Sequence, residues 1–377
     1  MNESPLLPLH RAASARITDS QSGPTLLLTY GDVPAEYRAG MEGALVFDET
    51  TRGRLHLRGS DTTAFLHRLL ANDVKGLGPG QGNRNLLLSG KGKTEHEFDL
   101  LPLEDGAGPG YSLTTAPGQS ARLASALDMY LFADDVQIED VTPECAPLAI
   151  CGPRAPQLLG EILGVQPPTE PYTPMTVEWA GAPVTLVGLP VAGSPGWRVD
   201  TVPGVVQALW TEIVGAGAEP GGLVARDALR VEAGQALFGM DLDDTVYPQE
   251  ARLEDAFSLT KGCYIGQEVV AKIDTYGGLN KCLFGLRVDH DDPVPAGTRL
   301  MREVNGEWRD LGVATSWSYS FVLDTGLVLA YVKRKHQAVG TTFRLGETAS
   351  TATIVEMPVR DGSVAFTGGT AETSDTP

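Results

Sequence analysis

The sequence predicts an α+β protein with a separate antiparallel β-barrel at its C-terminal end. Runs with strand-like alternation and runs with helical spacing follow one another over residues 45–234, which is typical of mixed α+β domains. Residues 283–359 show only alternating runs joined by turns, and Asn305 and Gly306 stand between two of them as a two-residue hairpin turn. We therefore place a small all-β barrel at residues 283–359.

Composition narrows the class of protein. The chain has 377 residues and is 42% hydrophobic, enough for two or three cores. Its formal net charge of −19 repels phosphate backbones and anionic membranes, so we expect no direct nucleic-acid or membrane binding. Histidines are scarce and show no metal-site spacing. The cysteines form no C-x-x-C pair, and residues 1–20 lack a secretory pattern, so we expect a reduced cytoplasmic protein without a metal site.

The first half of the chain predicts alternating strands and helices after a flexible N-terminal arm at residues 1–22. Ser60 and Asp61 are candidate N-caps of the first of these helices, and His67 is expected to be solvated. Residues 89–93 are rich in Gly and Lys but lack P-loop spacing, so we predict a hairpin turn. We expect strands at 53–59, 86–88, 94–103, 111–115, 136–141 and 146–152, and helices near 65–70, 119–131 and 158–163.

The second half continues this alternation up to the barrel. Residues 237–244 form an acidic loop without the spacing of a calcium site, and we interpret it as solvated acid. Residues 360–377 have little apolar content and are expected to be a disordered tail. We expect strands within 177–191 and at 197–202, and helices at 205–214 and 226–234.

Residues 259–268 carry the densest group of side chains that can do chemistry. We predict a helix at 265–273, which places Cys263 just ahead of a helix N-terminus, where backbone N–H groups and the helix dipole favour a thiolate. Lys261 adds positive charge nearby. A packed cysteine in a tight strand-to-helix corner, with Glu268 facing solvent, is the alternative, and local chemistry leaves both open.

The motif at residues 261–268, K-G-C-Y-I-G-Q-E, together with Pro-Gln-Glu at 248–250, resembles the signature of the YgfZ-type folate-binding proteins. These proteins are relatives of the glycine-cleavage T protein, an aminomethyltransferase. The resemblance implies a T-protein-like fold, with two interleaved α+β parts within residues 23–282 and the C-terminal barrel around a central channel that binds a reduced folate. Supporting matches occur at 45–48, 59–61, 65–66, 70–74, 225–232, 330–332 and 340–341.

In the YgfZ-type branch the role is maintenance of iron–sulfur enzymes, including a tRNA-methylthiolating one. The resemblance therefore implies a monomeric tetrahydrofolate-binding accessory protein that serves iron–sulfur proteins or their assembly factors, with Cys263 as the functional thiol. Lys272, Tyr276 and Lys281 stand where arginines are common in that branch. Candidate folate contacts are Arg226, Lys261, Gln267, Glu268, Lys272 and Lys281.

Two positions depart from the aminomethyltransferase pattern. His96 and Glu97 stand where those enzymes carry an aspartate pair, and Arg198 stands near their pterin-binding glutamate. An arginine cannot accept the amino N–H groups of a pterin. We therefore expect an accessory protein rather than a working aminomethyltransferase. Two alternatives stay open: a tetrahydrofolate-dependent aminomethyltransferase with His96 or Glu97 as a substitute base, and a scaffold whose acidic surface docks partners.

Overall fold

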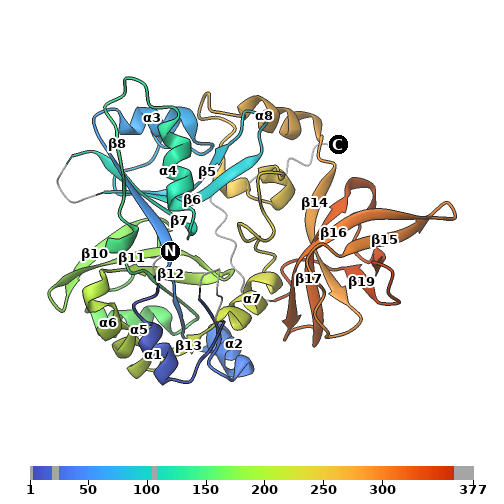
Figure 1. Ribbon diagram of the computed structural model, residues 1–377, viewed down its shortest axis with the longest axis horizontal. Coiled ribbons are helices and arrows are strands. Elements are labelled where there is room, and N and C mark those ends of the chain that lie inside the picture. Colours follow the sequence, from blue (N-terminus) through green and yellow to red (C-terminus); the bar gives the residue numbers. More distant parts are fainter. Residues whose placement is uncertain (1–2, 19–24, 104–107, 361–377) are drawn as a thin grey trace, which may run out of the picture.

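The computed structural model describes residues 3–18, 25–103 and 108–360, which form two large β-sheets with their helices, a small two-stranded sheet and a closed β-barrel (Figure 1). The first sheet has the strand order β10-β11-β12-β9-β3-β13, and the second has the order β5-β6-β7-β4-β8. The barrel closes in the order β14-β17-β16-β15-β18-β19. The predicted fold class, α+β with a C-terminal antiparallel barrel, is confirmed.

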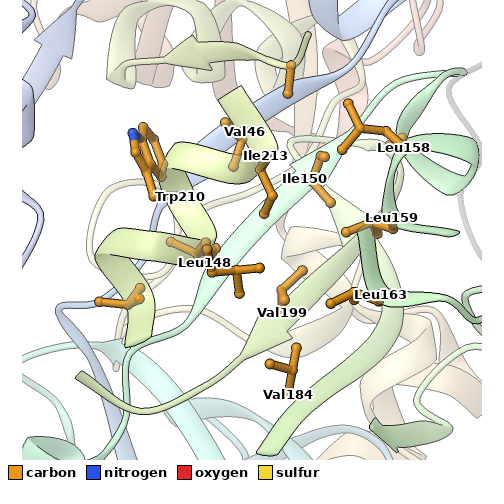
Figure 2. Close-up of a cluster of buried hydrophobic side chains, with 14 of the residues drawn as sticks. Val46, Leu148, Ile150, Leu158, Leu159, Leu163, Val184, Val199, Trp210 and Ile213 are labelled. Atoms are coloured by element: carbon orange, nitrogen blue, oxygen red, sulfur yellow. The ribbon is translucent and has the colours of Figure 1, made fainter. Parts of the chain in front are cut away.

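The first sheet is sandwiched between two helical layers. On one face, α5 and α6 bury an apolar cluster that includes Trp210, Ile213 and Val199 (Figure 2). On the other face, Tyr37 of α2 and Leu229 of α7 pack against the sheet. The elements are β3 (Leu45–Asp48), β9 (Leu148–Cys151), β10 (Pro174–Trp179), β11 (Ala182–Val191), β12 (Ser194–Asp200), β13 (Glu219–Gly221), α2 (Val33–Glu42), α5 (Ala155–Leu163), α6 (Pro203–Gly215) and α7 (Leu223–Glu232).

The second sheet is built from the chain between β3 and β9, so the two α+β parts interleave in sequence as predicted. Its own core forms where α3 and α4 cover one face, and residues 89–93 make the turn between β5 and β6. The elements are β4 (Arg52–Arg58), β5 (Asn83–Leu88), β6 (Thr94–Pro102), β7 (Gly110–Pro117), β8 (Gln137–Asp140), η1 (Thr142–Glu144), α3 (Thr62–Leu69) and α4 (Ser120–Asp128).

The barrel begins directly after α8 (Gln267–Tyr276). Asn305 and Gly306 have φ values of 54° and 81°, the left-handed conformation that a two-residue hairpin turn of this kind requires. The elements are β14 (Lys281–Val288), β15 (Arg299–Val304), β16 (Glu307–Ser320), β17 (Thr325–Lys333), η4 (Arg334–His336), β18 (Thr342–Leu345) and β19 (Thr351–Ile354).

The connection from α7 to α8 runs between the two sheets and the barrel (Figure 1) and contains η2 (Pro248–Ala251) and η3 (Glu254–Ala256). Its apolar side chains, among them Leu242 and Val246, share one cluster with Leu88 of β5 and Leu329 of β17. This segment therefore joins the parts through a common core. The central channel that the resemblance implies stays a prediction.

Three expectations need correction. Within the arm, residues 7–12 form α1 (Leu7–Ala12), followed by β1 (Arg16–Thr18), which pairs with β2 (Leu26–Thr29); Leu6 is fully buried because it joins the core of the first sheet. The acidic loop is not simply solvated, because Asp241 is buried and accepts hydrogen bonds from Arg230 (2.8 Å) and Ser316 (2.6 Å). The helix α8 begins at Gln267, because Gly266 adopts a left-handed φ of 80° at its N-cap.

Residues 361–377 of the expected disordered tail lie outside the described residues. Within the described ranges, every helix is too short or too polar to cross a membrane.

Candidate functional site

Cys263 lies on the loop between η3 and α8 and is exposed to solvent. The other three cysteines are less accessible. Burial raises the pKa of the Cys151 thiol to about 12, and it also raises the pKa values of Cys145 and Cys282. Of the four thiols, Cys263 is therefore the one presented to other molecules.

The loop that carries Cys263 is fastened to α3 by a two-way contact. His67 Nε2 donates to the Lys261 carbonyl over 3.1 Å, and the Lys261 ammonium donates to the carbonyl of His67. Burial lowers the pKa of Lys261 to about 8. Burial, followed by the charge of Lys261, lowers the pKa of His67. His67 is only 16% exposed, so the expectation of a solvated residue is wrong.

The C-terminal side of the same loop rests on the turn at residues 89–93. A Cβ atom on Gly266 would lie 2.6 Å from the Ser89 carbonyl oxygen, so only glycine allows this approach. The Pro-Gln-Glu segment also supports the loop, because Gln249 Nε2 donates to the Val270 carbonyl of α8 over 3.0 Å. Tyr264, next to the thiol, is buried in the central core. Cys263 is thus an exposed residue between two anchored ones.

The structure brings most of the predicted site residues onto this loop and helix, and separates two of them. Gln267 is half-buried at the first position of α8. Glu268 and Lys272 are exposed and pair with each other at 3.9 Å. The helix dipole acts most strongly within the first turn of a helix. Because α8 starts four residues after Cys263, the thiol lies outside that turn. Arg226 belongs to a different cluster on α7, and Lys281 begins β14, where its ammonium lies 4.5 Å from the Tyr331 ring centroid. Their roles in folate binding stay predictions.

A groove of about 500 Å³ opens beside the loop. Its lining is acidic, with Asp73, Glu254, Asp255 and Asp274 among the contributing residues, and it shares Ser258 and Leu259 with the segment that leads to Cys263. A negative potential of this kind disfavours an anionic folate tail and favours a cationic or neutral partner group.

The cluster that contains Arg226 lies between the two sheets. Arg198 of β12 is 1% exposed and donates to Asp99 of β6 (2.6 Å) and to Asp200 (3.0 Å). Arg54 of β4 donates to the same Asp200. These contacts exist because strand alternation puts Val199 into the helix-covered core and turns Arg198 and Asp200 toward the second sheet. The two α+β parts are therefore joined here by ion pairs.

Glu49 continues this network at the crossing from β3 to β4. It accepts hydrogen bonds from Arg52 (3.2 Å) and forms an ion pair with Arg226, whose guanidinium lies 5.5 Å from the Phe47 ring centroid. Burial raises the pKa of Glu49, but the charges of Arg226 and Arg52 outweigh burial and lower it to about 2. We call the set of Glu49, Arg52, Arg54, Asp99, Arg198, Asp200 and Arg226 the seam network.

Neither substitute base proposed from the sequence is available to a substrate, since His96 is buried and Glu97 is paired. His96 lies on the face of β6 opposite Glu97, toward the core under α3 and α4; burial, followed by the charge of Arg122, lowers its pKa to about 4. Glu97 is held by Arg84 of β5 through a 2.7 Å bond from Nε. A general base for a reaction at neutral pH needs a free lone pair and a pKa nearer 7.

Sequence reasoning missed His67, Arg54 and Asp99. Arg54 and Asp99 carry one usable signal, since each is a charged residue within an alternating strand. The contact of His67 with Lys261 joins residues 194 positions apart and has no local signal.

Comparison with known proteins assigns the family. A family model of the GCVT N-terminal domain matches residues 10–261, and a model of the glycine cleavage T-protein C-terminal barrel domain matches residues 281–361. The chain belongs to the glycine cleavage T-protein family. The prediction of this superfamily is thereby confirmed, while assignment to its YgfZ-type branch is not tested by these matches.

Individual relatives agree with this assignment. A protein of Rubrobacter xylanophilus named aminomethyltransferase is 31% identical over 95% of this chain and 94% of its own length. A putative chloroplastic transferase of Arabidopsis thaliana is 28% identical over 82% of this chain and 69% of its own length. The crystal structure of the glycine cleavage system aminomethyltransferase T from Bartonella henselae has the same fold, with a TM-score of 0.83 at 23% identity, covering 96% of this chain and 98% of that one.

Proposed function

We propose that this protein binds a reduced folate, tetrahydrofolate, and supports the assembly or repair of iron–sulfur enzymes, including tRNA-modifying ones, with Cys263 as its functional thiol. Folate binding is supported by membership of the T-protein family and by relatives named aminomethyltransferase. The accessory role is supported by the motif at residues 261–268.

One observation carries this proposal: the motif presents its cysteine at the surface on a loop anchored from both sides. The contact between Lys261 and His67 fixes one side, and the fit of Gly266 against the turn at 89–93 fixes the other. A purely structural cysteine needs neither exposure nor such support. An exposed thiol on a rigid loop is available to a partner protein, which fits a role in delivering or repairing a cluster.

The second candidate is a tetrahydrofolate-dependent aminomethyltransferase. The specific observation in its favour is that the Rubrobacter relative, 31% identical over 95% of this chain, carries that name. Against it, His96 is buried against a core and Glu97 is bound by Arg84, so neither is an accessible base. Arg198 also presents donors where a pterin amino group needs an acceptor.

Two measurements test the proposal. Calorimetric titration of the full chain with tetrahydrofolate under anaerobic conditions should give saturable binding, and its absence at millimolar ligand would remove the folate part. Cys263→Ala should lower the activity of iron–sulfur enzymes in cells that depend on this protein, while Cys282→Ala, a control at a half-buried cysteine outside the motif, should not.

The two candidates are separated by a transfer assay. Purified protein, tetrahydrofolate and an aminomethyl donor should yield no methylenetetrahydrofolate if the accessory role is correct. Production that survives Cys263→Ala would instead establish the transferase. A Cys263→Ala variant with no effect in cells and no transfer activity would point to a scaffold.

A further inference from the structure

The seam network contains buried hydrogen-bond donors that no described residue satisfies. Nε of Arg52, Nε of Arg54 and Nη2 of Arg198 are shielded from solvent and lack a partner among the described residues, and so does the hydroxyl of Thr114. Arg198 and Thr114 are 1% exposed and Arg54 is 8% exposed. A buried unsatisfied polar group costs about 1–3 kcal/mol, and more when it is charged, so three in the network and a fourth beside it call for an explanation.

Strand register places these groups together. Arg84 pairs with Asp99 across β5 and β6, Asp99 pairs with Thr114 across β6 and β7, and Thr114 pairs with Arg54 across β7 and β4. Residues directly opposite each other in antiparallel strands share a face, so all four line one row across the second sheet. Arg198 reaches this row from the first sheet through its bond to Asp99.

The charges of the network leave one cation in excess. Its four arginines face three carboxylates, Glu49, Asp99 and Asp200. The adjoining Arg84 is matched by Glu97, and Asp255 beyond it has a side chain that is 35% exposed and so keeps much of its hydration. The excess lies at Glu49, which Arg52 and Arg226 share, and an anion that joins the network would balance it.

The network is also open on one side. The side chains of Arg52, Arg226 and Asp99 are 25%, 24% and 15% exposed, whereas Arg198 beneath them is sealed. The outer members of the network therefore contact solvent, while the unsatisfied donors lie behind them.

We propose that the seam network is a binding site for a carboxylate group. Every unsatisfied arginine atom is an N–H donor, which selects an acceptor-only ligand. A carboxylate can accept two N–H bonds from a guanidinium, and its single negative charge matches the one excess cation. The amino edge of a pterin is excluded because it also donates. The carboxylate has two possible sources, a free small acid or the glutamate tail of a folate. The site does not involve Cys263 and does not rest on the accessory role proposed above.

The probe is sodium formate, titrated into the full-length chain at constant ionic strength by replacing sodium chloride. Formate should raise the melting temperature saturably up to about 100 mM, because a ligand that binds only the folded state stabilises it by mass action. Sodium phosphate at equal ionic strength should give a smaller effect. Equal melting temperatures in formate and chloride would overturn the proposal.

Two conservative variants locate the site. Arg54→Lys keeps the charge beside Asp200 but removes the unsatisfied Nε–H, and Thr114→Val removes one hydroxyl at constant shape. Each should weaken formate binding about tenfold, the effect of losing one charge-assisted hydrogen bond. Thr115→Val is the matched control, since this neighbour faces the other side of β7 and donates to the Ala116 carbonyl (3.0 Å); its formate affinity should change less than twofold. Unchanged affinity in both site variants would overturn the assignment.

Competition then separates the two sources. Tetrahydrofolate that displaces formate in the wild-type chain but not in Arg54→Lys assigns the site to a folate tail. Tetrahydrofolate that binds without displacing formate assigns it to a free acid. Failure of the folate proposal, seen as no tetrahydrofolate binding, leaves the formate result intact, so the two failures are distinguishable.

Discussion

The Cys263 loop and the seam network differ in almost every physical respect. The loop is exposed, carries a single thiol and is held by a few hydrogen bonds around Lys261 and His67. The network is buried, contains seven charged groups and joins strands from two sheets. In the loop, the thiol itself is exposed, so its replacement leaves the buried contacts of the loop in place. In the network, ligand preference and stability depend on the same side chains, because each buried charge needs its partner.

The largest effect is expected when Arg198 is removed from the network. Arg198→Met leaves Asp99 without its 2.6 Å partner and Asp200 with Arg54 alone, and breaking a buried ion pair in this way costs about 3–5 kcal/mol. Urea unfolding monitored by circular dichroism would measure the loss. Arg68→Met is the matched control, because its partner Asp134 is on the surface, and it should change stability little. Similar losses in both variants would show that burial does not set the cost.

The second prediction concerns the thiols. Under native conditions a thiol-specific reagent should label Cys263 first, and Cys263→Ala should abolish this fast phase. Cys151 is fully buried and should react at least about a hundredfold more slowly than Cys263, because its labelling requires an opening of the structure. Mass spectrometry of timed samples would assign each site. Fast labelling of Cys151 in the Cys263→Ala variant would contradict the difference in accessibility.

Much of the fold could be predicted from the sequence, and the candidate site only in part. Alternation and helical spacing located β4, α3, α5, α6 and the barrel hairpin at Asn305 and Gly306, because these signals are local. The motif at 261–268 identified Cys263. Its helix start was placed two residues early, because the left-handed conformation of Gly266 depends on packing against the turn at 89–93. The seam network was missed, because the contact of Arg198 with Asp99 joins residues 99 positions apart in two different sheets.

The third prediction tests how tightly the loop is held. Burial lowers the pKa of Lys261 from 10.5 to about 8, whereas in the unfolded chain the amine keeps its proton up to its ordinary value. Between these two pH values the unfolded state binds more protons than the folded state, so wild-type stability should rise with pH relative to Lys261→Met. Urea unfolding of both proteins across this window gives the difference. A wild-type protein that loses stability relative to the variant would mean that the loop does not bury the amine.

An effect no larger than that at Lys261 is expected at His96. Burial, followed by the charge of Arg122, lowers its pKa from 6.5 to about 4. As pH falls through this window, the imidazole is therefore protonated in the unfolded chain but not yet in the folded chain. As pH is lowered between these values, the free energy of unfolding of the wild-type protein should therefore fall relative to that of His96→Asn. Arg122→Met should raise the pKa of His96 in the folded state. An imidazole with a midpoint near 4 is too weak a base for proton abstraction at neutral pH. A midpoint near 7 would instead restore His96 as a candidate base and would favour the aminomethyltransferase over the accessory role.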